Sequence, residues 1–125
     1  MTIKHVDQAR RLARDRFPDA LAVVLAGSTA TGRATARSDL DIAALVEDGG
    51  ETGRETIRFE DRVVELFVHT RAGLVELFAA DVAARRAVLQ SMYATGLVLV
   101  DTNGEAGRAR ALAEADLRKR TPVPV

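Results

Sequence analysis

Residues 27–41 read Gly-Ser-Thr-Ala-Thr-Gly-Arg-Ala-Thr-Ala-Arg-Ser-Asp-Leu-Asp and separate two apolar runs. Both runs have the length of strands, and they predict buried strands over residues 21–26 and 39–46. Alternate side chains of a strand share a face, so Asp39 and Asp41 are expected to project together. Neighbouring carboxylates repel each other unless a cation offsets their charge. Because Mg²⁺ takes oxygen ligands of this kind, the pair predicts a metal site at the start of the second strand.

The corner that follows the first strand has the residues of an anion site. Gly27 allows a sharp turn and a close approach of the backbone to a ligand. Ser28 can cap a short helix over about 28–32 and also offer its hydroxyl to a phosphate. The alternative is that Ser28 only caps the helix and binds no ligand. A P-loop is excluded, because Arg33 stands where that loop needs Lys and Ala34 where it needs Ser or Thr.

Periodicity and chain breakers predict the remaining elements. Thr70 is the expected cap of a helical segment that starts near Ala72 and ends before Gly96, as one helix or two. The other predicted elements are a helix over 3–17, a hairpin of strands over 55–60 and 63–69 joined at Asp61-Arg62, a strand over 97–100, a turn at Asn103-Gly104 and a helix over 105–118.

These elements predict an α/β (α+β) fold with a mixed, largely antiparallel sheet of four to five strands flanked by helices. We expect one domain over residues 1–120 and a flexible tail over residues 121–125, where Pro122 and Pro124 cannot continue the last helix. The length of 125 residues suits a single domain.

Composition narrows the class of protein. Eighteen basic and eighteen acidic residues cancel, so no overall field attracts nucleic acid. The chain has no cysteine, which excludes disulfides and thiolate metal sites and fits a cytoplasmic location. No apolar run approaches the length of a membrane span. Sixteen of the eighteen basic residues are Arg, a bias that indicates a GC-rich prokaryotic genome.

The combination of motifs resembles a known superfamily. Gly27-Ser28, ten intervening residues and Asp39-x-Asp41 are followed by an acid, Glu65, within the apolar strand Val63–Val68. This pattern, over roughly residues 20–100, is similar to the nucleotidyltransferases typified by DNA polymerase beta. It is closest to the small prokaryotic branch that includes aminoglycoside nucleotidyltransferases and MNT antitoxins.

The resemblance implies a minimal nucleotidyltransferase fold and a reaction. A nucleoside monophosphate, AMP from ATP, would pass from the Mg-NTP to a hydroxyl of a protein or small molecule, with release of pyrophosphate and with two Mg²⁺ ions as cofactors. Asp39 and Asp41 would bind both metals, and Glu65 would be a third ligand or the base for the acceptor hydroxyl.

The resemblance also implies roles for nearby residues. Gly27 and Ser28 would hold the triphosphate. Arg33 and Arg37 either contact a phosphate or are solvated, and Ser38 would fix the turn before the first acid. Glu65 as a surface carboxylate remains the alternative to its metal role.

Two other side chains near the predicted site are open to more than one interpretation. His69 either lines the site or is structural. Tyr93 is expected in the core.

The acceptor and partners stay open at this level. An MNT-like antitoxin would modify a HEPN-type toxin, whereas a non-catalytic module would bind nucleotide without releasing pyrophosphate. A homodimer through an exposed helix is a further expectation, and neither a membrane nor a nucleic acid is expected as partner.

Overall fold

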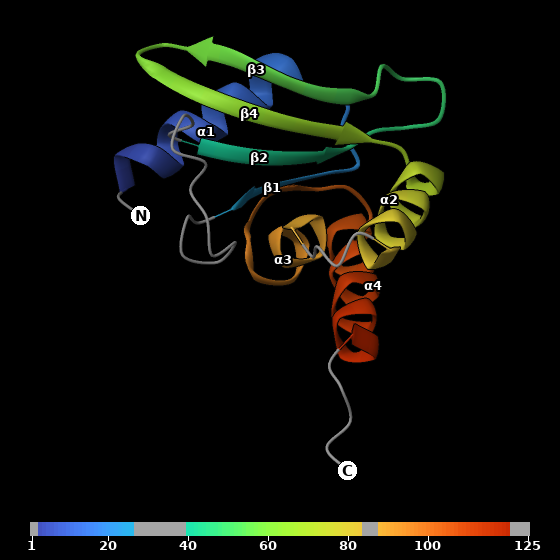
Figure 1. Cartoon of the computed structure of the whole chain (residues 1–125). Coiled ribbons are helices and arrows are strands. Elements are labelled where there is room, and N and C mark those ends of the chain that lie inside the picture. Colours follow the sequence, from blue (N-terminus) through green and yellow to red (C-terminus); the bar gives the residue numbers. More distant parts are fainter. Residues whose placement is uncertain (1–2, 27–39, 84–87, 121–125) are drawn as a thin grey trace.

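The computed structural model describes residues 3–26, 40–83 and 88–120 (Figure 1). The predicted short helix over about 28–32 and the tail over 121–125 lie outside these ranges. The elements, in chain order, are α1 (Ile3–Arg16), β1 (Ala22–Ala26), β2 (Leu40–Leu45), β3 (Gly53–Phe59), β4 (Arg62–His69), α2 (Arg71–Ala83), α3 (Val88–Thr95), β5 (Leu97–Asp101) and α4 (Glu105–Arg120).

The five strands form one sheet in the order β3-β4-β2-β1-β5. Only the pairing of β2 with β4 is parallel among the described strands, and the other three pairings are antiparallel. The predicted mixed, largely antiparallel sheet flanked by helices is therefore confirmed. β3 and β5 are the edges, and β1 and β2 are buried along their whole length.

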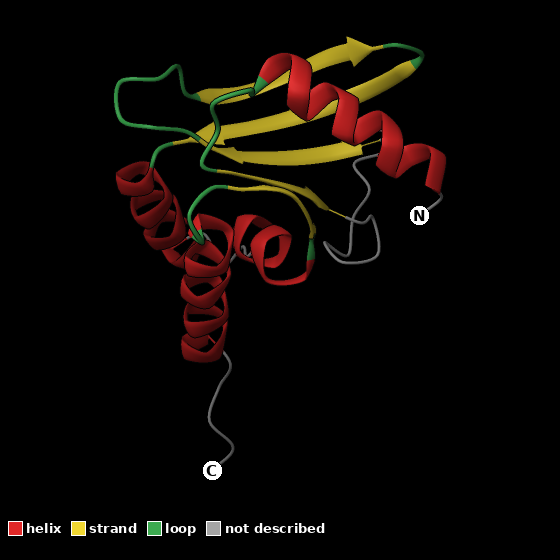
Figure 2. Ribbon diagram, turned by 180° about the vertical axis from the view of Figure 1, so that it is seen from behind, coloured by secondary structure: helices red, strands yellow, loops and turns green. Residues whose placement is uncertain are grey.

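Helices cover both faces of this sheet (Figure 2). Helix α1 packs on one face through Leu12 and Ala13, against strand residues that include Ile42 and Leu66. Helices α2, α3 and α4 pack on the other face, where the buried core includes Tyr93. Because successive side chains of a strand alternate between these faces, apolar runs rather than alternating patterns mark the central strands.

The hairpin of β3 and β4 turns one residue earlier than the sequence suggests. Phe59 pairs with Arg62, so Glu60 and Asp61 form the connection rather than Asp61 and Arg62. Glu60 has a φ of 55°, in the left-handed region that tight hairpin turns require. The predicted strand over 55–60 therefore starts earlier and ends earlier, which brings Arg54 into the ladder.

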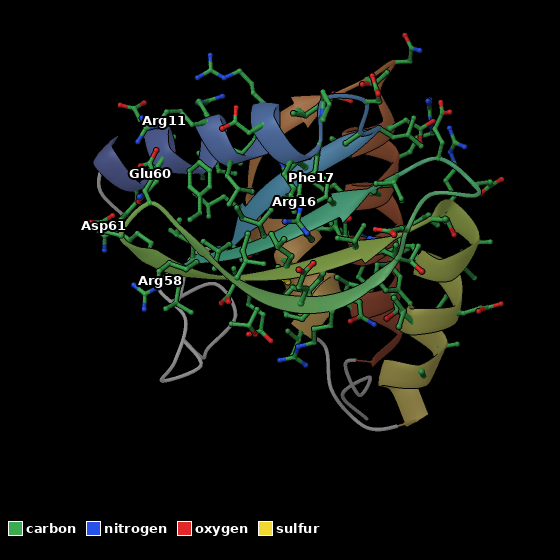
Figure 3. The ribbon with its side chains drawn as sticks, turned by 90° about the horizontal axis from the view of Figure 1, so that it is seen from above. Arg11, Arg16, Phe17, Arg58, Glu60 and Asp61 are labelled. Carbon is green, nitrogen blue, oxygen red and sulfur yellow. The ribbon has the colours of Figure 1, made fainter. Side chains whose placement is uncertain are left out.

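Polar contacts connect α1 to this hairpin (Figure 3). The guanidinium of Arg11 donates to both carboxylate oxygens of Glu60. Gln8 donates to Glu60 and Asp61, each at 3.0 Å. Arg16 forms an ion pair of 2.8 Å with Glu55 further along β3. These bonds hold the edge of the sheet against the helix that covers it.

The segment between Thr70 and Gly96 forms two helices. Thr70 Oγ1 accepts the backbone N–H of Gly73 at 3.1 Å and caps α2, as predicted. Arg71 at the start of α2 donates to Glu105 at the start of α4, which ties these helices together. No helix within the described ranges is long and apolar enough to cross a membrane.

Candidate active site

Asp41 and Glu65 lie side by side on the two parallel strands. They are direct partners in the register of β2 and β4, and paired residues of neighbouring strands point to the same face. Neighbouring strands are about 4.8 Å apart, which brings the two carboxylates within reach of a shared ion. The sequence separates these residues by a whole hairpin strand, and the parallel pairing brings them together.

Both side chains share the sheet face that α2, α3 and α4 cover. Asp41 precedes Ala43 by two positions and Glu65 precedes Phe67 by two, and both of these apolar residues contact the core on that face. Asp41 is 9% exposed and Glu65 is 7% exposed. Two carboxylates at this depth need cations or hydrogen-bond donors to offset their charge.

Arg54 supplies one such partner. Its Nε donates to Oε1 of Glu65, and its Nη2 forms an ion pair with the same oxygen. The guanidinium carbon also lies 4.9 Å from the ring centroid of Phe67, in a cation–π contact. Arg54 therefore fixes the position of the Glu65 side chain across the pairing of β3 with β4.

The end of β1 and the start of β2 lie beside Asp41. β1 ends at Ala26, which is the register partner of Asp41, and β2 begins at Leu40. The segment between these strand ends, 27–39, carries the predicted phosphate-binding and metal-binding residues. Gly27, Ser28, Arg33, Ser38 and Asp39 all fall in that segment, outside the described residues, and their roles remain predictions.

The sequence profile of the nucleotidyltransferase domain matches residues 6–90, more than half of the chain. This chain belongs to the nucleotidyltransferase domain family. The match covers most of α1 and all of β1 to β4 and α2, and it includes both Asp41 and Glu65. None of the curated proteins compared with the chain matches it.

A solved structure has a similar fold. The crystal structure of a nucleotidyltransferase-like protein from Exiguobacterium sibiricum superposes with a TM-score of 0.62 at 10% sequence identity. The match covers 85% of this chain and 38% of that protein. At this identity the likeness concerns the fold, and the nucleotidyltransferase domain described here spans well under half the length of that relative.

The donor atoms of the domain fit a divalent cation, although the described residues supply only part of a site. Two in-register carboxylates offer the hard oxygen ligands that Mg²⁺ prefers. Within residues 3–26, 40–83 and 88–120 no group of three His, Asp or Glu side chains gathers around a common point. Asp39, the other acid of the predicted set, lies outside those ranges.

His69 has a structural role in the nucleotidyltransferase domain. It follows Glu65 by four positions on β4, yet its Nε2 is joined by a hydrogen bond of 2.6 Å to the hydroxyl of Tyr93. The two rings meet edge to face, with centroids 5.5 Å apart. Burial lowers the pKa of His69 to about 4, so the ring is neutral near pH 7. Tyr93 lies in the core, as predicted.

Two surface hollows are lined by residues other than the two acids, although Arg54 borders the second. One of about 340 Å³ runs between α1 and β5 and is lined by Arg10, Arg14 and Leu99 among others. The other, of about 570 Å³, lies where α1, the loop after β2 and β3 meet, beside Phe17 and Glu55. Neither is lined by Asp41 or Glu65, so we do not assign the reaction to either.

Sequence reasoning missed Arg54. The predicted hairpin began its first strand at residue 55 and turned at Asp61-Arg62, which left this arginine outside the predicted strand. With the turn at Glu60 and Asp61, residue 54 pairs with Phe67 and shares a face with Glu65. In the sequence, the position of the hairpin turn is the signal that would have placed Arg54 beside Glu65.

Proposed function

We propose that this domain transfers a nucleoside monophosphate, AMP from ATP, to a hydroxyl group and releases pyrophosphate. The observation that carries the proposal is the register pairing of Asp41 with Glu65 in a chain of the nucleotidyltransferase domain family. Ala26, the last residue of β1, is the register partner of Asp41. Gly27 and Ser28 follow Ala26 directly in the chain.

In this proposal Asp39, Asp41 and Glu65 hold two Mg²⁺ ions. Bound divalent ions would supply the charge neutralisation that phosphoryl-type transfer requires. The backbone around Gly27 and the hydroxyl of Ser28 would bind the triphosphate, with Arg33 as a further phosphate contact. Ser38 would fix the turn that leads into the acids.

The reaction breaks one bond and forms another. The acceptor oxygen bonds to the α-phosphorus, the bond from that phosphorus to the bridging oxygen breaks, and pyrophosphate leaves. The acceptor hydroxyl gives up its proton. Glu65 serves either as a metal ligand or as the base for this proton.

The test uses the full chain with α-labelled ATP, Mg²⁺ and a prokaryotic lysate as the source of acceptors. We expect label to move to a protein or a small molecule while pyrophosphate is released. Asp41→Asn should lower the rate by at least about a hundredfold, because charge stabilisation of this kind accounts for that much. Glu76→Gln on the exposed face of α2 is the matched control and should keep the wild-type rate.

Two results would count against the proposal. Equal rates of transfer by the wild type and Asp41→Asn would show that the acid pair takes no part in the reaction. Nucleotide binding by the wild type without transfer or pyrophosphate release would favour a non-catalytic binding module.

A further inference from the structure

Arg54 is a solvent-exposed partner of Glu65. It lies on the edge strand β3, and its side chain is 61% exposed, whereas the side chain of Glu65 alone is 10% exposed. The guanidinium reaches that carboxylate over the ring of Phe67, its partner across the ladder. An exposed cation therefore pairs with one member of a nearly buried pair of acids.

Arg54 and a divalent ion would compete for the carboxylate of Glu65. A divalent ion bound by Asp41 and Glu65 would place positive charge next to the guanidinium, which is a like charge at short range. The carboxylate of Glu65 cannot bind the guanidinium and the divalent ion with full strength at the same time. Arg54 can yield at low cost, because its side chain is exposed and Phe67 can still hold the planar group by stacking.

We propose that Arg54 is a positioning residue that holds Glu65 in the metal-free domain and is displaced from it by the divalent cation. Arg54 thus lowers the affinity of the acid pair for a free cation and keeps Glu65 in place until the cation arrives. This inference rests on the proposed function, because it assumes that the cation binds at Asp41 and Glu65.

The test measures Mn²⁺ binding to the full chain by electron paramagnetic resonance, without nucleotide. We expect Arg54→Gln to bind Mn²⁺ roughly two- to fivefold more tightly than the wild type, the factor that corresponds to loss of a partly exposed ion pair. The direction of the effect is informative, because a variant that only damaged the site would bind the ion more weakly.

Arg58→Gln is the matched control. Arg58 lies on the same strand and the same face, four positions along, opposite Val63 and away from α1 (Figure 3). Its removal takes the same charge from the hairpin without removing the contact to Glu65. We expect a change in affinity clearly smaller than that of Arg54→Gln. Equal changes in the two variants would overturn the proposal.

Arg54→Lys keeps the charge but loses the planar group that contacts Glu65 and Phe67 together. Its affinity for Mn²⁺ should lie between those of the wild type and Arg54→Gln. An affinity equal to or weaker than that of the wild type, in either Arg54 variant, would show that Arg54 does not compete with the ion.

Glu65→Gln separates failure of this inference from failure of the proposed function. If Glu65→Gln weakens Mn²⁺ binding and Arg54→Gln leaves it unchanged, only the inference fails. If the wild type and Glu65→Gln bind the ion equally, the cation does not use Glu65, and the metal site of the proposed function fails as well.

Discussion

Asp41 and Glu65 owe their position to two different strands with the same alternation of side chains. In β2, Leu40 and Ile42 face α1, so Asp41 between them must face the other helices. In β4, Val64 and Leu66 face α1, so Glu65 between them also faces the other helices. The alternation of side chains along each strand therefore determines which face each acid occupies.

The neighbour of Glu65 could not be predicted in the same way. A slip of one residue in a hairpin turn changes every cross-strand partner, and the sequence placed the turn at Asp61-Arg62. Glu60 adopts the left-handed conformation instead, which is uncommon for a residue other than Gly, Asn or Asp. Arg54 consequently stayed outside the predicted strand, although it contacts Glu65 directly.

His69 should make the stability of the domain depend on pH. Its pKa is about 4 in the folded protein and near 6.5 when unfolded, so the unfolded chain binds more protons between these values. The stabilising contribution is complete above pH 6.5 and is lost as the pH falls toward 4. Between pH 7 and pH 5, His69 should account for a loss of about 2 kcal/mol in the free energy of unfolding.

Urea denaturation of wild type and His69→Phe at both pH values measures this contribution. The variant cannot take up the proton, so its stability should fall less between pH 7 and pH 5. Tyr93→Phe is the control: it removes the hydrogen-bond partner but keeps the buried imidazole, and should retain the wild-type pH dependence. An equal loss in wild type and His69→Phe would show that burial of His69 does not set this dependence.

A single residue, Gly96, connects α3 to β5. Gly96 donates its N–H to the carbonyl of Met92 at 2.8 Å, and a Cβ at this position would lie 2.3 Å from that same oxygen. Arg110 from α4 donates to the carbonyls of Tyr93 and Gly96, which satisfies the end of α3. Sequence reasoning identified Gly96 as a helix stop, but the close approach that requires glycine needs the packed structure.

Gly96→Ala should destabilise the domain, because the backbone of α3 would have to move to admit the methyl group. We expect a loss of about 2 kcal/mol in the free energy of unfolding, the usual cost of overpacking. Gly107→Ala is the matched substitution on the exposed face of α4, where nothing lies within 4 Å of the added Cβ. It should stabilise the domain by up to about 1 kcal/mol, since Ala favours the helix. Chemical denaturation measures both, and equal effects would contradict the role given to Gly96.

The order of strands brings the site together at the scale of the whole molecule. The hairpin of β3 and β4 is added to β2 so that β4 runs parallel to it, and this arrangement aligns Asp41 with Glu65. Local patterns predict strands and hairpins, yet they carry no signal for which distant strands pair. The family pattern of Gly-Ser, Asp-x-Asp and a later acid supplied that information for this chain.

The proposed metal site spans β2 and β4. It can be located by a crystal structure of the full chain with Mn²⁺ and a non-hydrolysable ATP analogue, in which the anomalous signal shows the ions. We expect an anomalous peak coordinated by carboxylate oxygens of both Asp41 and Glu65, beside the phosphates of the analogue. An analogue bound with its ions away from these two carboxylates would contradict the proposed site.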